Sequence, residues 1–263
     1  MPITREAMVW SAAQYDAAKR LFTIGKNNSQ IARELGIPRT TVRDWRRDQR
    51  RPRLSDGTPC GTSHDFTSVL AEPYCYLLGL YLGDGCISRS GRVWRLRITL
   101  DDKYPSIITR CREAINLLMP SQRAASLQRA GCVEVSLYSK HWPCFFPQHG
   151  VGRKHQRAIV LEPWQQTLVD QATQEFVMGL IHSDGCRVVA NDRGVASIRY
   201  HFSNRSEDIL GLFTAALDSL AIPWTRSSPH IVSVYRKAAT ARLDEFVGPK
   251  DQAVPWNRVH YTA

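Results

Sequence analysis

Apolar residues recur along the chain with two different periods, and these periods predict its helices and strands. Near the N-terminus, apolar positions at helical spacing run from Tyr15 to Ile24 and again over residues 31–35. Val42 and Trp45, three positions apart, form one face of a further helix. We therefore expect three short helices, closing a small core, within the first fifty residues.

Capping and turn-forming residues lie at the start of the second predicted helix and between the second and the third. Asn28 or Ser29 can cap the second helix. Gly36 follows it, where a tight turn needs positive φ. Pro38 suits the first turn of the third helix, because its missing N–H would be unpaired there in any case. The pattern predicts a helix-turn-helix.

This segment resembles the helix-turn-helix of bacterial repressors and recombinases, whose second helix enters the major groove of DNA. The resemblance implies base contacts from Arg39, Thr40 and Arg43. Phosphate contacts are expected from the arginines that follow: Arg46, Arg47, Arg50, Arg51 and Arg53. The alternative is a helical hairpin with a solvated basic face. Residues 54–70 are rich in Gly, Ser, Thr and Pro without an apolar period, which predicts a linker.

Beyond the linker, the chain contains two copies of one unit about a hundred residues long. LLGLYLGDG, which ends at Gly85, matches VMGLIHSDG at an offset of 100. Residues 95–108 match the second copy at an offset of 102, and VSLYSK (135–140) matches VSVYRK at 97. Three blocks in the same order with nearly constant offsets establish the repeat.

Each copy has the pattern helix, strand, strand, helix, strand, strand, helix. Apolar and polar residues alternate over 95–100 and 198–203, so one sheet face should pack on a core and the other stay open. Helices over 107–118 and 209–220 should cover the apolar face. The open face carries the residues that we expect to contact DNA from the sheets: Arg95, Arg97, Arg199 and His201.

Composition and charge narrow the function. The 263 residues are 43% hydrophobic, enough for well-filled cores, and carry a formal net charge of +11. Residues 1–53 hold 12 Lys and Arg against 5 Asp and Glu, whereas the other 210 residues hold 23 against 19. This concentrated excess indicates a polyanionic partner. Seven irregularly spaced cysteines without a CxxC pair argue against zinc, and no apolar run or leader pattern predicts a membrane or secreted location. We expect a cytoplasmic protein.

The paired motifs resemble those of LAGLIDADG homing endonucleases, in the single-chain form with two motifs, over residues 72–248. The resemblance implies an α+β fold, in which two pseudo-twofold-related αββαββα repeats form a DNA-binding saddle behind a small all-α helix-turn-helix domain. Gly79 and Gly179 would let the two motif helices approach closely. The expected domains are 1–53 (helix-turn-helix), 54–70 (linker), 71–250 (repeat one 71–150, connection 150–172, repeat two 173–250) and 251–263 (tail).

The same resemblance implies a metal site. Asp84 and Asp184 would end the two motif helices, and their carboxylates would bind Mg²⁺ or another divalent cation together with the carbonyls of Gly83 and Ser183. The other interpretation of each Asp-Gly pair is a plain helix-terminating turn. Two positions before each aspartate the chain has Leu82 and His182, where the eponymous motif has Asp. Catalytic support from a basic residue at each repeat's last strand is assigned to Lys140 and Lys237, with Arg236 as an alternative.

We therefore expect a sequence-specific, metal-dependent endonuclease that cuts both strands of duplex DNA. The main alternative is a non-cleaving DNA-binding regulator of the same fold, as in a bacterial sporulation regulator that joins such a domain to a helix-turn-helix. An RNA maturase is less consistent with the helix-turn-helix, and the terminal residues argue against an intein. Since both halves lie in one chain, we expect a monomer without an obligate protein partner or membrane contact.

Overall fold

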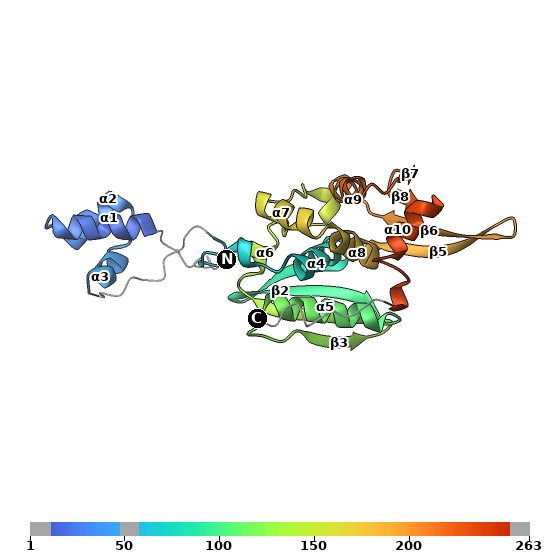
Figure 1. Cartoon of the computed structure of the whole chain (residues 1–263). Helices are drawn as coiled ribbons and strands as arrows, with labels where there is room; N and C mark the ends of the chain where they lie inside the picture. The colour runs from blue at the N-terminus through green and yellow to red at the C-terminus, as the bar shows by residue number, and fades with distance from the viewer. Residues whose placement is uncertain (1–11, 48–57, 253–263) are drawn as a thin grey trace. The chain divides into compact units, whose positions relative to one another are not determined.

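The computed structural model describes residues 12–47 and 58–252, in two compact units that divide between His64 and Asp65. The first unit contains α1 (Ala12–Thr23), α2 (Asn28–Leu35) and α3 (Arg39–Arg47), drawn in blue in Figure 1. Its core contains Ile31, Val42 and Trp45, and the Trp45 ring meets Tyr15 edge-on with centroids 5.3 Å apart. The three helices predicted from the apolar spacing are confirmed.

The cap of α2 differs from the prediction by one residue. Asn27, and neither Asn28 nor Ser29, is the N-cap: its Oδ1 accepts hydrogen bonds from the backbone N–H groups of Ser29 and Gln30, each at 3.0 Å. The Gln30 side chain accepts in return from the Asn27 N–H at 2.9 Å. This capping box satisfies donors that a helix start leaves unpaired. Gly36 adopts the predicted left-handed conformation, with φ of 64°.

The second unit contains the predicted repeat. The first copy comprises α4 (Ala71–Asp84), β1 (Gly85–Ser90), β2 (Val93–Asp101), α5 (Pro105–Leu118), β3 (Ala125–Arg129), β4 (Cys132–Ser139) and α6 (Trp142–Phe145). The second comprises α8 (Thr173–Asp184), β5 (Gly185–Asp192), β6 (Val195–Ser203), α9 (Glu207–Ser219), β7 (Thr225–Ser228), β8 (Ile231–Val234) and α10 (Lys237–Asp244). The predicted element order is confirmed in both copies, and α7 (Pro163–Gln171) lies between them. The unit also contains the 3₁₀ turns η1 (Phe66–Ser68), η2 (Lys154–Gln156) and η3 (Lys250–Gln252).

The two sheets have the same topology. Their strand orders are β1-β2-β4-β3 and β5-β6-β8-β7, with every neighbouring pair antiparallel. Leu96 pairs with Leu137 in the first sheet, and Phe202 pairs with Val232 in the second. All four side chains are buried, in the core that also contains residues of α5 and α9. The α+β fold with one covered and one open face in each sheet agrees with the predicted alternation.

Helices α4 and α8 pack against each other at the centre of the second unit (Figure 1). A Cβ atom added to Gly179 would lie 2.2 Å from the Tyr76 carbonyl oxygen, and one added to Gly79 would lie 2.6 Å from the Leu180 nitrogen. The two backbones therefore touch, which only residues without a side chain allow at these positions. Close packing brings the C-terminal ends of the two helices together. Among the described helices, none is long and apolar enough to span a bilayer.

Candidate functional site

Asp84 and Asp184 are the last residues of α4 and α8, and each is followed by the glycine that begins a strand. A Cβ added to Gly83 would lie 2.2 Å from the Ser183 hydroxyl oxygen and 3.0 Å from Oδ2 of Asp184. The carboxylate of one repeat thus lies against the last helical turn of the other. The structure brings together the two aspartates that the repeated motif singles out.

The surroundings of both carboxyls disfavour their charged form. Burial raises the pKa of Asp84 to about 6, and the nearby charge of Asp184 adds to this effect. Burial also raises the pKa of Asp184, opposed by the Asn204 amide, which donates a hydrogen bond to Oδ2 of Asp184 at 2.6 Å. Since each carboxylate also ends a helix, where the peptide dipoles place partial negative charge, the pair attracts cations.

Two lysines approach this pair, Lys154 from η2 between the repeats and Lys250 from η3 after α10. The Lys154 ammonium donates hydrogen bonds to the carbonyl oxygens of Gly83, at 2.9 Å, and Gly85, at 2.7 Å. The Lys250 ammonium donates to the carbonyl oxygen of His182 at 2.9 Å. Burial lowers the pKa of Lys154 to about 8 and also lowers that of Lys250, while the two aspartates oppose both shifts. Both helix ends therefore carry a largely desolvated ammonium group.

These lysines were missed by the sequence reasoning, which assigned the basic role to Lys140 and Lys237. Lys140 follows β4 and Lys237 begins α10; both are exposed, and neither lines a cavity that contains an aspartate of the pair. Arg236, the alternative, is also exposed at the N-cap of α10. One signal was available: Lys154 and Lys250 are 96 residues apart, close to the offset of 97 at the end of the repeat.

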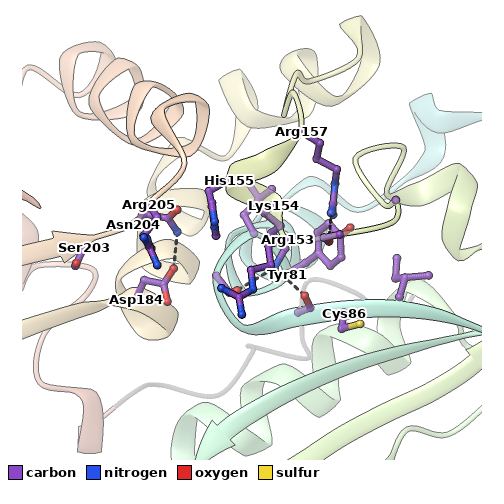
Figure 2. A pocket seen from close by; sticks show the side chains of 16 residues that line it. Tyr81, Cys86, Arg153, Lys154, His155, Arg157, Asp184, Ser203, Asn204 and Arg205 are labelled. Atoms are coloured by element: carbon purple, nitrogen blue, oxygen red, sulfur yellow. Dashed lines mark hydrogen bonds between the residues drawn. The ribbon is translucent and has the colours of Figure 1, made fainter. Parts of the chain in front are cut away.

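Each aspartate lies in a cavity of its own. The cavity at Asp184 has a volume of about 440 Å³, and Figure 2 shows residues 153–155 of the inter-repeat segment facing Asp184 across it. The cavity at Asp84 has a volume of about 510 Å³ and is also lined by Asp101, at the end of β2, and by His182 and Ser183. His182 is almost fully buried, and its Nδ1 lies 3.0 Å from the Tyr76 hydroxyl of α4.

The donors fit a hard divalent cation in part. Carboxylate oxygens are the ligands that Mg²⁺ prefers, and the two carboxylates repel one another although two ammonium groups are near. The carbonyl of Gly83 fits less well, because the Lys154 ammonium already donates to it. Ser183 faces the Asp84 cavity, and its hydroxyl donates to the Leu180 carbonyl at 2.9 Å.

The open sheet faces carry the predicted basic residues in unequal surroundings. Arg95 forms an ion pair with Glu134 and donates to the Ser136 hydroxyl at 3.0 Å, while Arg97 lies 3.7 Å from Glu134. Glu134 is only 8% exposed, and its place between two arginines was not anticipated. In the second sheet Arg199 is half-buried, and His201 Nδ1 lies 2.8 Å from a serine hydroxyl, that of Ser233.

The predicted DNA-reading residues lie on α3. Arg39, Thr40 and Arg43 are exposed over its N-terminal half, and the Arg43 guanidinium lies 3.1 Å from Asp44. Arg47 is exposed at the end of the helix, whereas Arg46 packs its guanidinium on the Phe22 ring, 4.3 Å from the centroid. Arg50, Arg51 and Arg53 lie outside the described residues.

Comparisons with known proteins give one family match. Residues 17–56 match the family model of homeodomain-like domains, which supports the helix-turn-helix. No curated protein matches the sequence.

Similar solved structures include three in which the chain covers most of the other protein. They are mesophilic variants of the homing endonuclease I-DmoI (14% identity, 68% of this chain, 96% of that one, TM-score 0.46), the homing endonuclease I-WcaI bound to its DNA recognition sequence (10%, 73%, 87%, 0.45) and the N-terminal LAGLIDADG domain of WhiA (13%, 72%, 86%, 0.44).

Proposed function

We propose that the protein is a sequence-specific endonuclease that hydrolyses both strands of duplex DNA with the help of a divalent cation, Mg²⁺ in the cell. The observation that carries this proposal is the convergence of Asp84 and Asp184 at the ends of two packed helices, each beside a partly buried lysine. Because each repeat contributes one carboxylate, each of the two DNA strands would have its own cleavage site. The basic helix-turn-helix and the polar open sheet faces are suited to a phosphate backbone.

In this proposal each group of side chains around the site has a different role. Asp84 and Asp184 would hold the cation, which when bound would lower the pKa of the attacking water and stabilise charge on the phosphate. Asn204 orients the Asp184 carboxylate through its 2.6 Å hydrogen bond. Lys154 and Lys250 place positive charge beside the carboxylates, where the negative charge of the reacting phosphate grows.

A second candidate is a regulator that binds DNA without cutting it. The Lys154 ammonium already donates to the carbonyls of both Gly83 and Gly85, so a fixed positive charge lies at this helix end without any metal. In this alternative the lysines stabilise the aspartate pair, and the two sheets serve recognition alone.

Cleavage of a plasmid that carries the DNA flanking the protein's own gene separates the two candidates. We expect the parent protein with Mg²⁺ to linearise it, and Asp84→Asn or Asp184→Asn to cut about a hundredfold more slowly or to leave nicks. Asp170→Asn, which changes an exposed carboxylate on α7, is the matched control and should cut like the parent. Tight, specific binding without cleavage in Mg²⁺ or Mn²⁺ would overturn the nuclease and favour the regulator.

The helix-turn-helix has its own test in the full chain. Arg47 is exposed at the end of α3, and we expect Arg47→Ala to remove one phosphate contact. The slope of log affinity against log salt concentration should then become shallower by about 0.9. Arg242→Ala, at an exposed ion pair with Glu245 on α10, provides the control. Equal slopes for the parent and Arg47→Ala would show that this arginine does not meet DNA.

A further inference from the structure

The two aspartates of the proposed active site lie in cavities of different charge. The Asp184 cavity contains Asp184 as its carboxylate and is surrounded by four basic side chains: Arg153, Lys154, Arg157 and Arg205 (Figure 2). The Asp84 cavity contains three carboxylates and two basic side chains: Asp84, Asp101, Asp251, Lys250 and Arg187. One cavity is therefore dominated by cationic groups and the other by anionic groups.

The contrast originates partly at one pair of equivalent positions. Asp101 ends β2 and lines the Asp84 cavity. Leu96 of β2 pairs with Ile87, and Tyr200 of β6 pairs with Arg187, so the sheet registers make Arg205 the counterpart of Asp101, and Arg205 lines the Asp184 cavity. A carboxylate in one repeat is thus replaced by a guanidinium in the other. Asn204, the preceding residue, supplies an amide donor to Asp184 where a metal site would need an acceptor.

The two basic groups of the Asp84 cavity differ in how strongly they would repel a bound cation. The Arg187 guanidinium donates to both carboxylate oxygens of Asp244, at 2.7 and 3.0 Å, so its charge is largely compensated there. Lys250 donates to the His182 carbonyl at the end of α8. Since the affinity of a site for a hard cation rises with its carboxylate number, the Asp84 cavity favours a divalent cation more than its counterpart. The basic cavity at Asp184 favours a phosphate group.

We propose that Asp84 and Asp101 together form the tighter divalent-cation site, and that the Asp184 site fills only at higher cation concentration or with DNA phosphate in place. This inference rests on the proposed nuclease function. Its consequence is that the two strands are cut in sequence, the strand at Asp84 first. In each cut, water adds its hydroxyl to phosphorus, one P–O ester bond breaks, and the leaving oxygen takes up a proton.

Titration of the full-length protein with Mn²⁺, followed by electron paramagnetic resonance without DNA, tests the ranking directly. We expect one tight Mn²⁺ in the parent, weakened about tenfold or more by Asp101→Ser. Arg205→Asp, at the counterpart of Asp101 in the Asp184 cavity, should add a second tight ion. Asp102→Ser is the matched control, because Asp102 bonds to Gln128 and lines neither cavity.

The reciprocal exchange makes the assignment specific. In the parent, Asp84→Asn should abolish tight binding, whereas in the Asp101→Arg and Arg205→Asp double variant only Asp184→Asn should do so. Two ions of equal affinity in the parent, or an unchanged affinity after Asp101→Ser, would overturn the ranking. Because no cleavage is needed for this measurement, it holds even if the nuclease proposal fails.

Strand order is then measured on a duplex with the cleavable site and a different label on each strand, at limiting Mn²⁺. The parent should accumulate a product nicked in one strand, and the double variant should nick the other strand first. Simultaneous cutting of both strands by the parent would contradict the sequence of cuts. An active parent whose nicked strand stays the same after the exchange would show that Asp101 and Arg205 do not determine the order.

Discussion

The open face of the first sheet contains a nearly buried glutamate between two arginines, whereas the second sheet has an isoleucine at the same place. Glu134 and Ile231 are related by the offset of 97, and each directly precedes the matching VSxYxK block. In the first repeat Glu134 partly neutralises Arg95 and Arg97. In the second repeat, the polar contacts of this face include the Ser227 and Ser233 hydroxyls, 2.7 Å apart.

The covered faces differ as well. In the second repeat Arg187, Tyr200 and Asp244 form a bonded group, and at the positions that correspond to the first two the first repeat has Ile87 and Leu96. At the interface of α4 and α8, by contrast, both repeats have a glycine. Backbone contact leaves no choice of residue there, while a sheet surface can change as long as its polar groups are paired. In the proposed nuclease, the two sheet faces would therefore recognise two different DNA half-sites.

The largest effect is expected where the repeats are the same. In Gly179→Ala the new methyl group would lie 2.2 Å from the Tyr76 carbonyl oxygen, an atom of the backbone that cannot rotate away. We expect the free energy of unfolding to fall by about 3 kcal/mol or more, because α4 and α8 must separate. Urea denaturation followed by circular dichroism measures this loss.

Gly211→Ala is the matched control for this prediction. Gly211 lies inside α9, and a Cβ atom there would meet nothing within 4 Å. Since alanine is the better helix former, this variant should be more stable by about 0.5–1 kcal/mol. If Gly179→Ala unfolds at the same urea concentration as the parent, the close contact of the two motif helices is wrong.

The next largest effect is expected in the hydrogen-bonded group of Arg187, Tyr200 and Asp244 in the second repeat. Asp244 accepts hydrogen bonds from Arg187 and from the Tyr200 hydroxyl, and the Arg187 guanidinium holds the pKa of Asp244 below its usual range. Asp244→Asn should cost about 1–2 kcal/mol near neutral pH. Because the folded-state pKa is lowered, this contribution is present at neutral pH and disappears as the pH falls below about 4.

Denaturation of the parent and of Asp244→Asn at several pH values measures whether their free energies of unfolding become equal at acid pH. Ile98→Val is the comparison in the first repeat; it should cost about 0.5–1.5 kcal/mol at every pH, because no charge is involved. A difference between the parent and Asp244→Asn that persists unchanged at acid pH would show that packing, and not the ionised carboxylate, stabilises the second repeat.

Much of the fold could be predicted because its determinants are local or repeated. The period-two alternation over residues 95–100 fixes which side chains of β2 are buried, and the repeat transfers that assignment to β6. The aspartate pair followed from the family resemblance of the two Asp-Gly motifs, which implied that the two motif helices pack side by side with their Asp ends together. These features depend on spacing along the chain.

Other features depend on contacts between distant segments and carry little local signal. Lys154 lies in an irregular stretch, and its role arises because its ammonium reaches the end of α4, 71 residues earlier in the chain. Glu134 lies within the largely buried strand β4, and only the strand order places it beside Arg95, 39 residues away. The prediction for Lys140 and Lys237 meets the same limit: the end of a strand is predictable, but the cavity it faces is not.

The smallest effect concerns the sheet faces and tests whether Glu134 restrains its arginines from DNA. In Glu134→Gln the carboxylate charge is lost while the shape is kept, so Arg95 and Arg97 become available to phosphates. We expect metal-free binding of duplex DNA by the full chain to strengthen several-fold. The slope of log affinity against log salt concentration should steepen by about 0.9 for each arginine that reaches a phosphate.

Two variants bracket this expectation. Glu207→Gln removes the same charge from an exposed ion pair with Arg226. Arg226 is paired across the sheet with Val232, which points into the core, so this ion pair does not belong to the open face and the slope should stay unchanged. Ile231→Glu installs the first repeat's carboxylate in the second and should make the slope shallower by about 0.9, because it would pair with Arg199. Equal slopes for Glu134→Gln and Glu207→Gln would mean that Glu134 serves folding alone. The difference between the two open faces would then lie outside the recognition of DNA.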